Sequence, residues 1–261
     1  MSISCRVSGG VLFVSLISSI ALACGGGPQT EPPPPAERKY LLERVDDAAV
    51  AQIYADGFEK LSLKEQTLIW HLSQAALAGR DIFYDQRYAH NLVMREVVEE
   101  ILTHPAGVDP ATLQEIQRYT KLFWINTGPY NNLTARKFVL KCGPEAFAAA
   151  AKAAAAGGAE FPLKNGETLD AMLERFQPLF FDPNVDPIVT SKTPGAGKDI
   201  LQASANNLYV GVTMKDLEGC TEKYPLNSRL VKRDGVLVEE VYRLGGKYGE
   251  ELAGIVKNLK A

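Results

Sequence analysis

Histidine is scarce in this chain, and a long run of basic residues is absent. The 261 residues include only three histidines, His71, His90 and His104, and 28 Lys and Arg residues stand against 31 Asp and Glu residues, a formal net charge of −3. Two histidines one helical turn apart, which a helical zinc-hydrolase motif needs, do not occur. The charge balance lacks the electrostatic footprint of a nucleic-acid-binding protein. We therefore expect no metal site in this chain and no nucleic-acid partner.

Residues 1–23 lack acidic side chains and have the composition of an export signal. They carry one Arg and an apolar run over 11–23 that is too short to cross a bilayer comfortably, so we predict a secretory signal peptide. Cys24 follows at once, and residues 24–39 form a Gly- and Pro-rich tether. This arrangement resembles a bacterial lipoprotein signal, which implies acylation of Cys24 and anchoring to a membrane. The expected location is the outer membrane, with the protein facing the periplasm. Cleavage after Ala23 without lipidation is the alternative.

Cysteine is also rare, and only Cys142 and Cys220 follow the tether. In an oxidising periplasm these two residues could form one disulfide. Two buried thiols are the alternative, because nothing in the sequence places the two side chains within bridging distance.

The body of the chain divides near residue 160 into a helical region, 40–160, and a mixed region of loops, strands and helix, 161–261. In the helical region, Ser62 and Glu65 form a capping box, and Gly79 is expected to close the following helix in the left-handed conformation. Apolar spacing predicts helices over residues 40–54, 63–78, 87–103, 110–124 and 144–156.

In the mixed region, Pro and Gly break the sequence into short segments, which predicts frequent turns and long loops. Residues 207–213, 228–232 and 236–243 are rich in β-branched and aromatic side chains, and Asp234-Gly235 predicts a hairpin between the last two. A final amphipathic helix is predicted over 249–259. The expected fold class is α+β, mostly helical.

Three candidate chemical features have simpler structural interpretations. The glycines around Lys198 lack the spacing of a phosphate-binding loop. The acid pairs Glu99-Glu100 and Glu239-Glu240 have no partner that the sequence places near them, which favours solvated faces. His71 lies in an apolar helix, where a core or interface histidine is favoured over a metal ligand.

The most informative segment is 123–139, where aromatic and polar side chains surround Gly128-Pro129. Asn126, Gly128 and Tyr130, followed seven residues later by Lys137-Phe138, match the Asn-x-Gly-x-Tyr and Lys-Phe pattern of the dipeptidyl peptidase III family. At this point the chain resembles that family of zinc exopeptidases, which remove dipeptides from the N-termini of short oligopeptides. Two further stretches, 70–76 and 210–232, are similar to family motifs in the same order.

The resemblance covers only the N-terminal portion of the family. It implies part of a two-lobed fold, with late strands of a small β-barrel core. The family's zinc-binding His-Glu-x-x-Gly-His helix does not occur here, so no catalytic residue is assigned and the chain is expected to be inactive alone. The resemblance implies that Asn126, Tyr130, Leu133 and Lys137 belong to one wall of a peptide cleft; a packed loop that ties two helices together is the alternative.

Two functions remain open. The chain is either the N-terminal portion of an exported, lipid-anchored zinc dipeptidyl peptidase III-like protein, whose zinc-binding catalytic half is absent, or a non-catalytic, lipid-anchored remnant that binds peptides or proteins. An incomplete barrel would leave sheet edges and apolar surface exposed. We therefore expect marginal stability or association.

Overall fold

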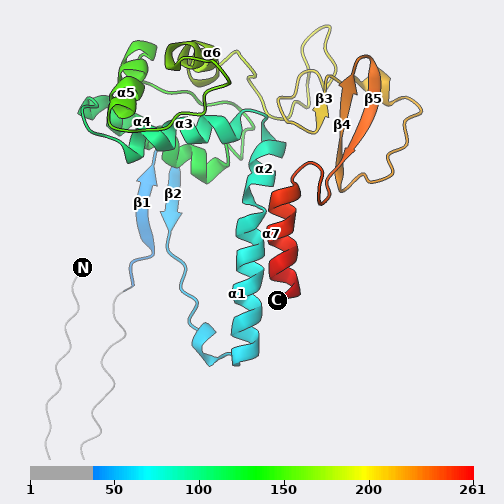
Figure 1. The fold of residues 1–261 in the computed structure, drawn as a ribbon, viewed down its shortest axis with the longest axis horizontal. Helices are drawn as coiled ribbons and strands as arrows, with labels where there is room; N and C mark the ends of the chain where they lie inside the picture. Colours follow the sequence, from blue (N-terminus) through cyan, green and yellow to red (C-terminus); the bar gives the residue numbers. More distant parts are fainter. Residues whose placement is uncertain (1–37) are drawn as a thin grey trace, which may run out of the picture. The chain divides into compact units, whose positions relative to one another are not determined.

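The structure is a computed structural model that describes residues 38–261. The predicted signal peptide and the predicted lipidation site, Cys24, lie outside the described residues. The chain from Tyr40 to Ala261 forms one unit. Its strands are β1 (Leu41–Val45), β2 (Ala48–Ala51), β3 (Tyr209–Val210), β4 (Ser228–Arg233) and β5 (Val236–Val241). Its helices are α1 (Leu63–Ala78), α2 (Arg80–Arg87), α3 (Asn91–Thr103), α4 (Pro110–Asn126), α5 (Pro144–Ala156), α6 (Leu169–Phe181) and α7 (Gly249–Lys260). The fold class is therefore α+β, as predicted (Figure 1).

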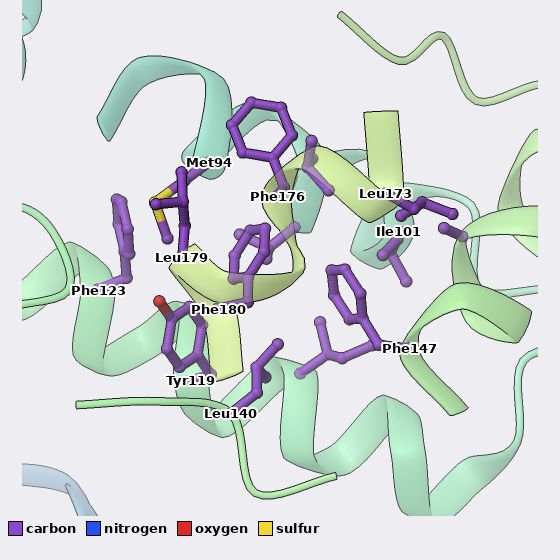
Figure 2. Packing of buried hydrophobic residues seen from close by; sticks show 14 of the residues in the cluster. Met94, Ile101, Tyr119, Phe123, Leu140, Phe147, Leu173, Phe176, Leu179 and Phe180 are labelled. Atoms are coloured by element: carbon purple, nitrogen blue, oxygen red, sulfur yellow. The ribbon is translucent and has the colours of Figure 1, made fainter. Parts of the chain in front are cut away.

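The hydrophobic core lies among helices α3, α4, α5 and α6. Its centre is the fully buried Phe180, whose ring lies 5.0 Å from that of Phe147 and 5.9 Å from that of Tyr119, centroid to centroid. Figure 2 shows these aromatic side chains meeting from three different helices. Large aromatic side chains remove much apolar area from water, so this cluster supplies much of the stability of the helical region.

Helix α7 packs along α1, as Figure 1 shows. Two glycines allow the helices to approach closely: a Cβ at Gly79 would lie 3.0 Å from Ile255 Cδ1, and a Cβ at Gly254 would lie 3.0 Å from Ala78 Cβ. A narrow seam of small residues therefore joins the two helices.

The start of α1 has the predicted capping box, in which Ser62 N donates to Glu65 Oε2 at 2.8 Å.

A single carboxylate fixes the beginning of α7. Asp85 on α2 accepts hydrogen bonds from Tyr248 Oη at 2.5 Å and from Lys247 Nζ at 2.8 Å. Tyr248 precedes α7 with a left-handed φ of 60°. The two hydrogen bonds that Asp85 accepts hold Tyr248 in this uncommon backbone conformation, so α7 is tied to α2 as well as to α1.

The late strands form an open three-stranded sheet. β4 pairs with β5 in antiparallel fashion and with β3 in parallel fashion. Asp234 and Gly235, with φ of 50° and 80°, form the hairpin turn that the sequence predicts. Neither of the sheets formed by residues 38–261 closes into a barrel.

The predicted helix over 40–54 is wrong, because β1 and β2 form an antiparallel hairpin there. The hairpin is held by ion pairs to α4. Asp46, in the turn, accepts from Arg118 Nη1 at 2.7 Å, and Glu43 accepts from Lys121 Nζ at 2.6 Å. Contacts remote in sequence therefore override a helix-like apolar spacing.

Other boundaries also differ from the predictions. Gly79 was expected in the left-handed conformation, but its backbone is right-handed, with φ of −87°. The reason is that α2 begins at the next residue, so Gly79 links two helices. The predicted helix over 87–103 begins at Asn91, and α2 lies before it. Helix α6 was not predicted, since Pro178 and the Pro and Gly residues around it suggested loops; its first turns are capped by the Thr168 hydroxyl. The helices over 63–78 and 144–156 have their predicted bounds.

The remaining cysteines are free thiols, and Cys142 is half-buried while Cys220 is exposed. The disulfide that the sequence left open is therefore not formed in the structure, and only one thiol is shielded from solvent. Within residues 38–261, no helix has the length and apolar character needed to cross a membrane.

We predict that Gly254→Leu separates α7 from α1, because a side chain at this position meets Ala78. Overpacking should lower the free energy of unfolding by about 2 kcal/mol, despite the better helix propensity of leucine. Hydrogen exchange of the α7 amides checks this. Ala253→Leu, at the exposed neighbouring position, is the matched control, and unchanged protection of α7 in Gly254→Leu would contradict the prediction.

Candidate functional site

The segment that carries the family resemblance begins with a sharp change of direction after α4. Thr127 has a left-handed φ of 53°, and Gly128 has a φ of 128°. A Cβ at Gly128 would lie 2.6 Å from the amide oxygen of Asn91. The buried Asn91 donates through Nδ2 to Tyr84 O at 2.9 Å and to Thr127 O at 3.1 Å. Gly128 is therefore required both by the backbone conformation and by lack of space.

Asn126 is buried and holds the loop to the end of α4. Its Nδ2 donates to Leu122 O at 2.9 Å, and its Oδ1 accepts from Asn132 N at 2.9 Å. The next turn is closed by Asn131 Oδ1, which accepts from the backbone N–H of Leu133 at 2.9 Å. The amide of Asn126 is thus used within the protein.

Tyr130 is completely buried in the interior behind the loop. Its hydroxyl donates to Asp186 O at 2.9 Å, and its ring lies edge-on to Tyr88 at 5.3 Å. The Tyr88 hydroxyl donates to Asp186 Oδ2 at 2.7 Å. Burial raises the pKa of both tyrosines well above the usual value, so both remain neutral hydrogen-bond donors at physiological pH.

Lys137 is buried at the C-terminal end of α6. Its Nζ donates to three backbone carbonyls, Val185 O at 2.8 Å, Asp182 O at 2.9 Å and Pro178 O at 3.3 Å. Burial lowers the pKa of Lys137 from 10.5 to about 8. The ammonium group therefore joins the loop, the last turn of α6 and the segment after α6.

Of the four residues predicted for a cleft wall, only Leu133 projects into solvent, with 93% of its surface exposed. The other three, Asn126, Tyr130 and Lys137, direct their polar atoms to backbone groups inside the protein. The structure brings them together as the internal supports of one loop.

The loop also pairs with the chain beyond α6. Lys137 N donates to Pro187 O at 3.0 Å, and Val189 N donates to Ala135 O at 3.0 Å. Ala135 has a left-handed φ of 58° at this crossing. The loop therefore sets the path of residues 187–191, and this segment forms one wall of a cavity.

The cavity has a volume of about 430 Å³ and lies between α2, residues 189–191 and the segment 200–209. Among the described residues that line it, Arg87, the last residue of α2, is the only charged one. The remaining lining residues are apolar or uncharged polar ones, Phe83, Gln86, Val189, Thr190, Ser191, Ile200, Leu201, Ser204, Asn206, Leu208 and Tyr209. A cation beside apolar and uncharged polar side chains is the arrangement of a small-ligand binding site.

Sequence reasoning missed this cavity. Its residues come from three separate segments, and none of them belongs to a recognisable motif. Arg87 carried a signal only in retrospect, as a cation at the end of a helix with no acidic residue one turn away in either direction. The path of the intervening chain brings the walls together, and local spacing does not contain that path.

A second hollow, of about 910 Å³, lies between the first half of α1 and the end of α7. Apolar side chains including Leu63, Leu68 and Leu259 line it. His71 also lies there, and its Nδ1 is 3.3 Å from Asn258 Oδ1 across the two helices. Of the two structural roles predicted for this histidine, core or interface, His71 therefore has the interface one, between α1 and α7.

The structure and the comparisons give no independent family assignment. Among residues 38–261, no group of three His, Cys, Asp or Glu side chains is placed to hold a metal ion. No protein-family model matches the chain, and no curated protein is significantly similar to it.

We predict that Lys137→Met lowers the free energy of unfolding by about 2 kcal/mol at neutral pH, because three carbonyl oxygens lose their donor. Since the pKa of Lys137 falls from 10.5 to about 8 on folding, the folded protein releases this proton first. The stability of the wild type relative to the variant should therefore rise as the pH rises through this window. Chemical denaturation at several pH values checks this. Lys141→Met, at an exposed lysine, is the control, and a pH-independent difference for Lys137→Met would contradict the prediction.

Gly128→Ala should destabilise the fold more than a positive φ alone explains, by about 3 kcal/mol, because the new methyl group collides with Asn91. Gly158→Ala is the matched control: its φ is 100°, and a Cβ there meets nothing within 4 Å. We expect a loss of about 1 kcal/mol for the control. Thermal and denaturant unfolding measure both, and equal losses would show that the contact with Asn91 does not matter.

Proposed function

We propose that this chain is the N-terminal portion of an exported, lipid-anchored zinc dipeptidyl peptidase III-like protein that acts on short oligopeptides. The observation that carries this proposal is the occurrence of three family-like motifs in order, over 70–76, 123–139 and 210–232. In this proposal the zinc-binding half is supplied from outside the present sequence. Cys24 anchors the protein to the membrane, and the peptides are bound between the two halves.

The surface of α1, which contains the first motif, supports the existence of a covering partner. Trp70 is 61% exposed, Leu68 57% and Leu63 79%. Helix α7 packs against α1, and the apolar side chains of α1 that stay exposed form a surface of the kind that a second lobe would bury.

The late sheet supports the same proposal. β3 and β5 are edge strands of an open sheet within the described residues. In a two-lobed dipeptidyl peptidase III-like fold, further strands would complete this sheet into the small barrel. The exposed edges therefore have a natural role as the join with additional chain.

In this proposal the zinc chemistry belongs to the other half, which would supply the His-Glu-x-x-Gly-His motif that does not occur in this sequence. There, zinc would lower the pKa of a bound water for attack on the peptide carbonyl. The present chain contributes the loop over 126–137 as part of the scaffold, with Leu133 as its exposed apolar tip.

A second function, a non-catalytic lipid-anchored binding protein for peptides or proteins, is favoured by one observation. The cavity beside Arg87 is lined by donors and apolar side chains but has no acid or base that could activate a nucleophile. Such a site can bind without a catalytic half.

The two functions predict different native masses in the source cell. Detection with an antibody raised against residues 40–261 should give a species far heavier than 28.4 kDa if the peptidase proposal holds. That species should release dipeptides from a chromogenic dipeptide substrate, and a zinc chelator should abolish the release. A species at the mass of the chain itself, changed only by signal removal and acylation, would overturn the proposal in favour of the binding protein.

A pair of substitutions distinguishes a specific partner on α1 from non-specific hydrophobic association. Leu68→Glu, on the exposed surface of α1, should abolish the heavier native complex if the catalytic half is a separate chain, or the activity if it is covalently joined. Leu226→Glu, at a side chain that is 99% exposed outside α1, should leave both unchanged. Equal effects of the two substitutions would count against a covering lobe on α1.

A further inference from the structure

Arg87 is a partly buried cation without a carboxylate partner. Its Nη2 donates to Tyr130 O at 3.0 Å, and its Nε is buried without any hydrogen-bond partner. Among residues 38–261, no Asp or Glu oxygen lies within ion-pair distance of its guanidinium. Burial lowers the pKa of Arg87 from its usual value, with no acid nearby to offset the effect. The protein therefore carries the desolvation cost of a cation without an internal counter-ion.

The other basic side chains on the neighbouring elements are used differently. On α3, Arg95 pairs with Asp81 at 2.8 Å, and on β4, Arg229 pairs with Glu240 at 2.6 Å. Each of these half-buried guanidinium groups has its own carboxylate. Arg87 differs from them because its side chain instead lines a cavity.

The cavity supplies what a small carboxylate ligand needs beside the cation. The hydroxyls of Thr190, Ser191 and Tyr209 make no hydrogen bond in the structure of residues 38–261 and are available as donors. Ser204 and Asn206 are instead engaged with the backbone, since Ser204 Oγ donates to Ile200 O at 2.6 Å and Asn206 Nδ2 donates to Val189 O at 3.1 Å. They form the fixed part of the wall.

The apolar side chains that line the cavity favour a ligand with an apolar group beside its carboxylate. Phe83, Ile200 and Leu208 are large apolar side chains at the cavity that remain substantially exposed. A hollow of about 430 Å³ holds a group of the size of an amino-acid residue. A single cation beside apolar walls suits one carboxylate with an apolar group better than a phosphate, which carries more charge and more oxygens.

We propose that this cavity binds the carboxylate of a small apolar acid, of the kind presented by the C-terminal residue of a peptide, with Arg87 as its counter-ion. The carboxylate would accept from the guanidinium hydrogens that Tyr130 leaves unused, and the apolar group would contact Phe83 and Leu208. This inference does not rest on the proposed peptidase function, because it needs neither zinc nor a second lobe.

The test compares two probes that differ only in charge, N-acetyl-L-leucine and N-acetyl-L-leucinamide, titrated into the full 261-residue chain in detergent and followed by ligand-observed NMR. We expect the acid to bind about tenfold more tightly than the amide, since a charge-assisted hydrogen bond replaces a neutral one. Equal binding of the two probes, or no binding of either, would overturn the proposal.

Three variants locate the effect. Arg87→Gln should reduce the preference for the acid to less than about twofold, and Arg87→Lys, which keeps the charge, should retain most of it. Arg136→Gln, at an exposed arginine that neither lines the cavity nor forms an ion pair in the described part of the chain, should change nothing. A circular dichroism melt checks that Arg87→Gln is folded. If Arg87→Gln does not fold, the result for Arg87→Lys decides the test. Loss of the preference in Arg136→Gln, or its absence in a folded Arg87→Lys, would overturn the assignment to Arg87.

Discussion

The ammonium group of Lys137 joins three parts of the chain: the loop after α4, the last turn of α6 and the segment after α6. Its three carbonyl partners come from the last turn of α6 and the segment that follows. Because the same backbone position also pairs with Pro187, the loop after α4 and the chain after α6 are fixed to one another. The wall of the Arg87 cavity continues from this junction through Val189.

The sequence predicts the elements whose signals are local. The capping box at Ser62 and the Pro-to-Gly frame around α5 have fixed spacings, and both helices have their predicted bounds. The hairpin at Asp234-Gly235 is equally local, because a two-residue turn defines its register. Where the signal is remote, prediction fails: the β1–β2 hairpin depends on ion pairs with α4, and residues 207 and 85 meet only through folding.

The candidate site divides in the same way. The motif residues Asn126, Tyr130 and Lys137 can be selected from the sequence as unusual, since polar groups of this kind are costly in a loop unless they have fixed partners. The sequence does not predict which way these side chains point, because that depends on backbone carbonyls up to 56 residues away in the chain. Arg87 shows the reverse case. Its lack of a counter-ion becomes visible only when every neighbouring acid has been assigned to another partner.

The seam between α1 and α7 has a kinetic consequence. His71 and Asn258 are 187 positions apart in the sequence, so α1 has to wait for almost the whole described chain before the helix that packs along it, α7, exists. Contacts of such long sequence separation form slowly, since chain closure has to precede them. During synthesis, the exposed apolar side chains of α1 would therefore stay uncovered for longer than any part of the α3–α6 core. This interval is where we expect the nascent protein to depend most on holding chaperones.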